Sequence, residues 1–240
     1  MKYIYPVVSR RSGGVSVGVN LNPNNACNWR CIYCQVPELK RGAAPVIDLA
    51  RLDVELRTFL QEILYGDFMQ IQVPSELRRI TDIALSGNGE PTSAKAFEQV
   101  IELIGRIRGS LELPKEIKLV LITNGSLIDR DYVQAGLRRM SEINGEVWFK
   151  LDSVTRSGRA LINNTRMSLN RTRTNLQLAS SCVFFHSTLQ AGRLHLSAAP
   201  GHRHIARALG LTLALPQPRG ADWRAAVRRL GRNGHPAPKQ

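Results

Sequence analysis

The twenty residues VSVGVNLNPNNACNWRCIYC, numbers 15–34, join a short β-type segment to three closely spaced thiols. Three valines alternate with small or polar residues over Val15–Leu21, and this period of two predicts a strand. The loop that follows carries Cys27, Cys31 and Cys34 in the spacing C-x3-C-x2-C. Cysteines grouped this closely, with only Cys182 elsewhere, indicate metal or redox chemistry more than a disulfide framework.

Working outward from this stretch, β-type runs alternate with apolar residues at helical spacing. Further strands are predicted over Ile83–Leu85, Ile117–Ile122 and Val147–Leu151, and helices over Leu52–Ile63 with Asp48 as N-cap, Phe97–Ile104, Tyr132–Met140 and Arg156–Ala179. Strands joined by helices of this length form right-handed crossovers and a mostly parallel sheet. We therefore predict an α/β fold with its ligands beyond the carboxyl ends of the strands.

Three thiolates can hold three irons of a [4Fe-4S] cluster and leave the fourth iron open to a substrate or cofactor. Two alternatives stay open. The thiols can be unrelated, or they can form a structural zinc site with Cys182 or one of the five histidines, all of which follow Cys182. The absence of a second closely paired ligand set favours the cluster.

The cysteine motif, with the aromatic Tyr33 just before the last cysteine, resembles the radical S-adenosylmethionine (radical SAM) superfamily. The resemblance implies that the three cysteines ligate a [4Fe-4S] cluster, that S-adenosylmethionine (SAM) chelates the unique iron, and that the Tyr33 backbone touches the adenine. It also implies an α/β fold that is a partial, incomplete parallel β/α barrel, because only four βα units are legible where the superfamily has about six.

A second motif follows the strand that ends at Leu85. Gly87, Asn88, Gly89 and Glu90 resemble the Gly-Gly-Glu motif of the superfamily, in which the glycines permit close approach and the glutamate binds the ammonium of SAM. The alternative is an ordinary glycine-rich turn with Glu90 capping a helix.

The segments at the ends of the predicted strands Ile117–Ile122 and Val147–Leu151 resemble SAM-binding segments of the superfamily less closely. By resemblance, Lys150 neutralises the SAM carboxylate, and Asp152 or Asn124 hydrogen-bonds the ribose. Lys150 and Asp152 lie on the same side of their strand, away from Phe149 and Leu151, which places the pair either in the barrel interior or at an exposed mouth.

The activity implied is reductive cleavage of SAM to methionine and a 5′-deoxyadenosyl radical, which abstracts hydrogen from a substrate. An electron donor such as a flavodoxin or ferredoxin is implied as partner. The Asn-Pro-Asn-Asn run resembles a branch related to wyosine-type tRNA base modifiers, so the substrate expected is an RNA base. The alternatives are a protein substrate, as in activation of a glycyl-radical enzyme, a non-enzymatic zinc-containing nucleic-acid-binding protein, and an inactive truncated relative.

Residues 183–240 differ in composition from residues 1–182, and we treat them as a separate basic tail. The first part holds 24 Lys and Arg against 18 Asp and Glu, whereas the tail holds 9 against 1. Such a change is typical of a GC-rich gene read in another frame, so we hypothesise a frameshift near Cys182, which sequencing the gene at that codon tests. The alternatives are a folded subdomain and an RNA-binding appendage with an apolar helix face at Trp223 and Leu230 and arginines such as Arg228 beside it.

The whole chain of 240 residues is 43% hydrophobic and 22% charged, as in soluble globular domains, and carries a net charge of +14. No run reaches the 18 or so apolar residues of a membrane span, and residues 1–14 lack a signal-peptide pattern. We expect a cytoplasmic protein without a membrane partner.

Overall fold

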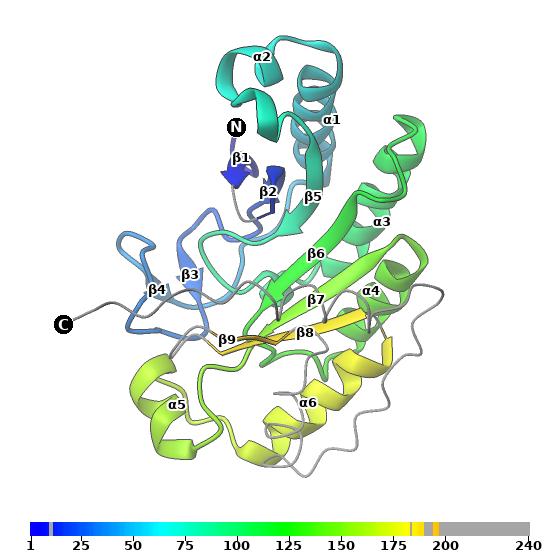
Figure 1. The fold of residues 1–240 in the computed structure, drawn as a ribbon. Helices are drawn as coiled ribbons and strands as arrows, with labels where there is room; N and C mark the ends of the chain where they lie inside the picture. Colours follow the sequence, from blue (N-terminus) through cyan, green and yellow to red (C-terminus); the bar gives the residue numbers. More distant parts are fainter. Residues whose placement is uncertain (10–11, 183, 190–193, 197–240) are drawn as a thin grey trace, which may run out of the picture.

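The computed structural model describes residues 1–9, 12–182, 184–189 and 194–196, with side chains as far as residue 182. In this part of the chain one sheet of seven strands runs in the order β1-β2-β5-β6-β7-β8-β9 (Figure 1). The strands are β1 (Ile4–Ser9), β2 (Gly14–Val19), β5 (Ile80–Leu85), β6 (Lys118–Thr123), β7 (Gly145–Lys150), β8 (Phe184–Leu189) and β9 (Leu194–Leu196).

The five central strands are parallel, and each pairs with the strand of this sheet that follows it along the chain. The edge strands β1 and β9 pair antiparallel with β2 and β8. A sheet whose neighbours follow the chain order, with crossover helices between them, is built like a barrel that has not closed. The mostly parallel α/β fold and the partial barrel are thereby confirmed.

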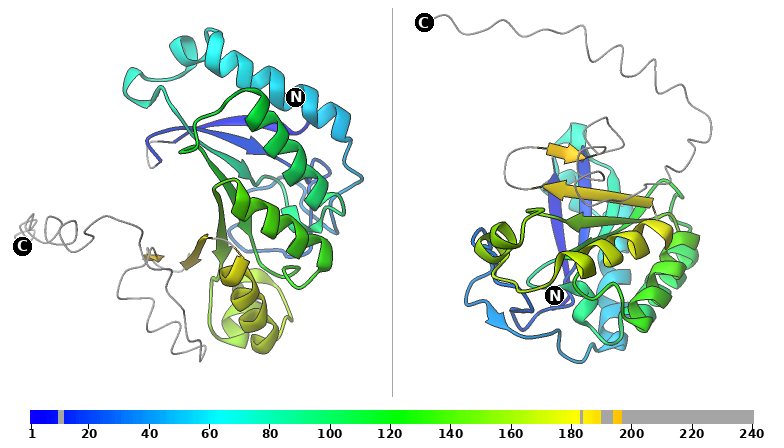
Figure 2. Two further views of the ribbon diagram at one scale, coloured as in Figure 1. Left: turned by 90° about the vertical axis from the view of Figure 1, so that its right-hand side faces the viewer. Right: turned by 90° about the horizontal axis from the view of Figure 1, so that it is seen from below.

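The helices follow the strands in the predicted alternation. They are α1 (Leu49–Tyr65), α2 (Phe68–Gln72), α3 (Phe97–Ser110), α4 (Asp131–Glu142), α5 (Arg156–Asn163) and α6 (Leu169–Cys182), with 3-10 turns at Ser75–Leu77 and Pro91–Ser93. Asp48 caps α1 as expected, since its Oδ1 accepts a hydrogen bond of 3.0 Å from the Arg51 amide. In Figure 2, α1, α3 and α4 lie together on one side of the sheet.

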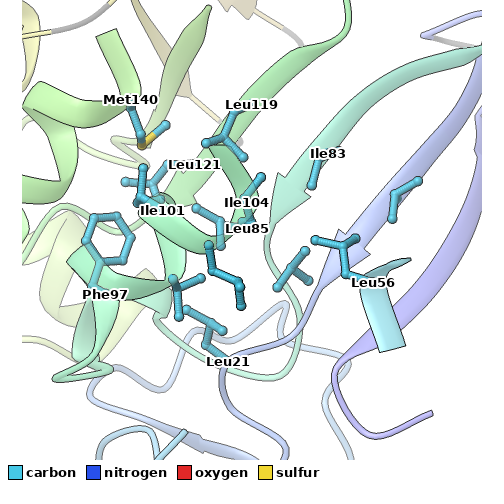
Figure 3. Close-up of a cluster of buried hydrophobic side chains, with 14 of the residues drawn as sticks. Leu21, Leu56, Ile83, Leu85, Phe97, Ile101, Ile104, Leu119, Leu121 and Met140 are labelled. Atoms are coloured by element: carbon cyan, nitrogen blue, oxygen red, sulfur yellow. The ribbon is translucent and has the colours of Figure 1, made fainter. Parts of the chain in front are cut away.

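The core lies between these helices and the sheet (Figure 3). Leu56 of α1, Phe97 and Ile101 of α3 and Met140 of α4 are all inaccessible to solvent, as are the inward-facing residues of β5 and β6, among them Leu85 and Leu121. Burying each such side chain contributes about 1.5–3 kcal/mol relative to leaving it exposed. The packed helical faces therefore fix the strands, and with them the loops at the strand ends.

Two parts of the fold differ from the sequence-based expectation. The single helix expected over Arg156–Ala179 is two helices, because Asn164 adopts a left-handed conformation with φ of 48° that ends α5. Ser168 then starts α6, its Oγ accepting from the Arg171 amide at 3.2 Å. The edge strand β1 was not predicted.

The sheet continues beyond residue 182 into β8, so its described strands extend past the residue at which the sequence composition changes. The predicted tail helix around Trp223 to Leu230 lies outside the described residues. None of the helices within the described ranges is long and apolar enough to cross a membrane.

Candidate functional site

One cavity lies at the carboxyl ends of the parallel strands and gathers every residue that the sequence nominated for cofactor binding. Its lining comes from the loop after β2, the loop after β5 and the ends of β6 and β7. These nominated lining residues are Cys27, Cys31, Tyr33, Cys34, Gly87, Asn88, Gly89, Glu90, Asn124, Lys150 and Asp152. The cavity is therefore built from four separate segments that the sheet topology brings together.

The cysteine loop is anchored at both ends by a small two-stranded sheet, β3 (Ala26–Cys27) with β4 (Lys40–Arg41). All three cysteines of the loop are free thiols; Cys34 is exposed and the other two are half-buried. Burial raises the pKa of Cys27 to about 11, although the Trp29 amide donates to its sulfur at 3.5 Å. Cys27 is thus a neutral thiol near pH 7, and a metal is what would hold it as a thiolate.

Asparagines connect this loop to the loop after β5. The side-chain oxygen of Asn20 accepts from the amides of Asn22 and Asn88, at 3.0 and 3.2 Å. The Asn88 side chain in turn donates to Asn25 Oδ1 at 2.7 Å. The Asn-Pro-Asn-Asn run therefore positions the cysteine loop against the glycine-rich loop.

The two glycines of that second loop fit where no side chain would. Gly87 has φ of +124°, a region that favours glycine. A Cβ on Gly89 would stand 2.1 Å from the carbonyl oxygen of Ala26, immediately before the first cysteine. Close approach of the two loops therefore requires glycine at position 89.

We expect Gly89→Ala to displace the cysteine loop, because the clash is with backbone, and so to reduce at least about tenfold the uptake of the cluster and SAM that the sequence resemblance implies. The matched control is Gly109→Ala in α3, where an added Cβ has no neighbour within 4 Å and should be neutral or mildly stabilising. Iron content after reconstitution and SAM titration measure the effect. Equal iron content and equal SAM affinity in the two variants would contradict this prediction.

Glu90 is the buried charge of the site, with 2% of its surface exposed. Its Oε1 accepts from the hydroxyls of Thr92 and Thr123 at 2.5 and 2.6 Å, and its Oε2 accepts from the Asn124 amide at 2.7 Å. It also caps the 3-10 turn at Pro91–Ser93, so the capping role considered from the sequence exists alongside the cavity position. Burial raises the pKa of Glu90, and these hydrogen bonds oppose that rise.

No cation balances Glu90 in the described residues, whose ion pairs include neither Glu90 nor Lys150. Lys150 is half-buried, and Phe149 and Leu151 on the other side of the chain are packed in the core. The period-two argument therefore held: Lys150 and Asp152 both line the cavity.

Asp152 is buried and takes part in a second polar network. Tyr33 donates its hydroxyl to Asp152 Oδ2 at 2.5 Å, and the Asn163 amide donates to the same oxygen. The other oxygen, Oδ1, is buried and has no hydrogen-bond partner in the part of the chain that the structure describes. Burial, and then the hydrogen bond to Asp152, raise the pKa of the Tyr33 hydroxyl, which keeps it a donor.

Asn124 is held in place from both ends of its amide. Its Nδ2 donates to Asn28 Oδ1 at 2.9 Å, and its Oδ1 accepts from the Ser126 amide at 3.0 Å. The neighbouring Gly125 has φ of +72° and packs against the Phe149 ring, where a Cβ would clash at 2.0 Å. Asn124 therefore links the end of β6 to the cysteine loop.

Sequence reasoning missed several residues of the site. Val36, Leu39 and Ile122 add apolar lining, and Asn28 and Asn163 tie the network together. Ile122 is the last residue of the predicted strand Ile117–Ile122. Its position at a carboxyl end could therefore have identified it as a lining residue. Asn163 lies 132 residues from its partner Cys31 in the sequence, and no local sequence pattern predicts that contact.

In the part of the chain with described side chains, no group of three or more His, Cys, Asp or Glu residues is arranged to hold a single metal ion. Tetrahedral zinc would need four such ligands around one centre. A [4Fe-4S] cluster takes each thiolate on a different iron, and the three thiols of the loop all line one cavity.

Comparison with known proteins gives a consistent result. The family model of the Radical SAM superfamily matches residues 21–184. A UPF0026 protein of Helicobacter pylori is 31% identical over 150 residues, which cover 62% of this chain and 42% of that protein. The chain thus spans less than half the length of this relative.

Solved structures of spore photoproduct lyase have a similar fold. A cysteine-to-serine mutant of that lyase gives a TM-score of 0.55 at 12% identity, covering 87% of this chain and 55% of the other. A double mutant with bound AdoMet and a dinucleoside spore photoproduct gives 0.53 at 12% identity, covering 85% and 54%. The family match, which extends from the end of the first parallel strand to the start of the last, shows that the chain belongs to the radical SAM superfamily, whose members are enzymes that use a [4Fe-4S] cluster and S-adenosylmethionine.

Proposed function

We propose that this chain binds a [4Fe-4S] cluster through Cys27, Cys31 and Cys34 and binds SAM in the adjoining cavity, to start radical chemistry on a substrate. The observation that carries the proposal is the cavity itself, which has three free thiols on one wall and, on another, a buried carboxylate with no ion-pair partner among the described residues. When bound, the cluster supplies the electron that cleaves SAM to methionine and a 5′-deoxyadenosyl radical.

The charged and polar side chains that line the cavity are complementary to the polar groups of SAM. Glu90 has no cation among the described residues and would bind the methionine ammonium, while Lys150 would bind the carboxylate. Asp152 Oδ1 is buried, has no hydrogen-bond partner within the described ranges, and would accept from a ribose hydroxyl. Asn124 already uses both ends of its amide, so of the two residues considered for the ribose we assign Asp152.

The adenine would lie against the apolar part of the lining. Ile122, Val36 and Leu39 line the cavity close to Tyr33, whose backbone is expected to contact the adenine. The same apolar residues would limit the access of water to the reacting centre.

For the substrate we propose an RNA base, with an external one-electron donor such as a flavodoxin or ferredoxin. The net positive charge of the chain supports a polyanionic substrate, and the resemblance of its Asn-Pro-Asn-Asn run supports RNA. The alternative is a protein substrate, as for glycyl-radical activation. Competition binding with tRNA at increasing salt separates them, because phosphate contacts give a steep fall of affinity with salt.

The test of the proposed function is the formation of 5′-deoxyadenosine. The protein is purified without oxygen, reconstituted with iron and sulfide, reduced, and incubated with SAM. Nucleoside formation with iron bound supports the proposal. Zinc without nucleoside supports the nucleic-acid-binding alternative, and iron without nucleoside indicates that the described barrel is not sufficient for turnover.

A further inference from the structure

The side chain of Asn163 connects a cluster ligand to a cofactor-binding residue. Asn163 is the last residue of α5 and is fully buried. Its Nδ2 donates to Cys31 Sγ at 3.3 Å and also to Asp152 Oδ2. One amide nitrogen thus uses both of its protons, one on the sulfur and one on the carboxylate.

The backbone holds this amide against the sulfur from two sides. The Arg30 amide donates to the Asn163 carbonyl at 3.2 Å, and the Ile32 amide donates to the Ile162 carbonyl at 2.8 Å. The two residues that flank Cys31 are therefore bonded to the last turn of α5. Figure 1 shows α5 beside the loop that contains β3 and β4.

A third connection comes from the guanidinium of Arg41, which bridges the same two segments. Its Nη1 donates to the Asn28 carbonyl and its Nη2 to the Asn164 carbonyl, each at 2.7 Å. The contact between Asn163 and Cys31 is thus fixed by a set of backbone bonds.

The neighbours of Asn163 also fix which way its amide points. A carboxylate accepts hydrogen bonds, and so does a metal-bound thiolate, so both favour the nitrogen over the oxygen of the amide. Asn163 Oδ1 consequently points elsewhere and has no partner among the described residues.

Hydrogen bonds to cluster sulfurs are one of the means by which proteins set the potential of an iron–sulfur cluster. Reduction adds one electron from the donor to the cluster and makes its thiolates better acceptors, so an N–H donor stabilises the reduced form more. We propose that Asn163 is a positioning residue that makes the cluster easier to reduce through its N–H···S bond to Cys31. This inference rests on the proposed function, because it requires a cluster on Cys31.

The test compares Asn163→Leu, which removes the donor at similar volume, with the matched control Asn175→Leu. Asn175 is also fully buried, and its Nδ2 donates to the Gly125 carbonyl at 2.7 Å instead of to a sulfur. Iron and sulfide are quantified in each reconstituted protein, and the midpoint potential is measured by redox titration followed by electron paramagnetic resonance, with dithionite as the electron source.

We expect the equilibrium constant for one-electron reduction to fall about threefold to tenfold in Asn163→Leu, where tenfold corresponds to about 59 mV. The control should keep the wild-type midpoint. An unchanged midpoint in Asn163→Leu with full iron content, or an equal shift in the control, would overturn the inference.

A second measurement needs no substitution and covers the case in which Asn163→Leu fails to fold. Wild-type protein is labelled with ¹⁵N only at asparagine side chains, and pulsed electron paramagnetic resonance of the reduced cluster is examined for a ¹⁵N coupling. The Asn28 side chain donates to Ser126 Oγ at 2.6 Å and meets the Cys27 sulfur through its oxygen, at 3.9 Å, so among the described residues Asn163 is the asparagine whose side-chain N–H donates to a ligand sulfur. A missing coupling on an intact cluster overturns the inference alone, whereas a wild-type protein that takes up no cluster overturns the proposed function and the inference together.

Discussion

Replacing Cys31 by alanine is expected to abolish cluster assembly and to lower 5′-deoxyadenosine formation by more than about 100-fold. Removing a residue that only supports a metal ligand already costs roughly 10–100-fold, and the loss of a ligand should exceed that. Cys31 lies at the centre of the loop, where its sulfur accepts from Asn163 and its carbonyl accepts from the Cys34 amide at 3.1 Å.

The matched control is Cys182→Ala, at the end of α6. Its thiol faces Gln134 Oε1 at 3.6 Å and does not line the cavity. We expect this variant to retain its iron and its nucleoside formation. A loss of iron in Cys182→Ala equal to that in Cys31→Ala would identify Cys182 as a fourth ligand of the cluster, and the iron left open for SAM would then not exist.

The sequence was sufficient to predict the parts of this fold that depend on periodicity. Apolar spacing located α1, α3 and α4, because these helices bury one face against the sheet. The alternation of Phe149, Lys150, Leu151 and Asp152 separated the core side of the chain from the cavity side, because the period of a strand is two. Parallel strands then brought their carboxyl ends to one edge, and the nominated residues met there.

The remaining features depend on contacts that no local pattern encodes. The break between α5 and α6 comes from the left-handed conformation of Asn164, which asparagine tolerates but does not require. The role of Asn28 arises only when β6 places Asn124 within 2.9 Å of it. Hydrogen bonds between loops far apart in the sequence follow from the finished fold, so the polar network around the cavity could not be derived from spacing.

The substitution Glu90→Gln should weaken SAM binding about 30-fold or more, since removing one partner of a buried charge pair costs about 2–5 kcal/mol. The matched control is Glu55→Gln in α1. Glu55 is also a buried carboxylate, but its oxygens accept from the Lys2 and Tyr3 amides and from Arg51, away from the cavity. Burial would raise the pKa of Glu55, yet these bonds lower it to about 2. The control should lose thermal stability and keep its affinity for SAM.

The raised pKa of Glu90 also predicts how the affinity for SAM responds to acid. The pKa of Glu90 is raised because burial outweighs its hydrogen bonds, and only its ionised form attracts an ammonium. SAM affinity of the wild type should fall as the pH drops from neutral through that raised pKa, by about tenfold per unit below it. Glu90→Gln has no group to protonate there, so its weaker affinity should stay flat over the same range in calorimetric titration. If wild type and Glu90→Gln bound SAM equally at neutral pH, the cavity would have to recognise the ammonium through another group, and the assignment of Glu90 would be wrong.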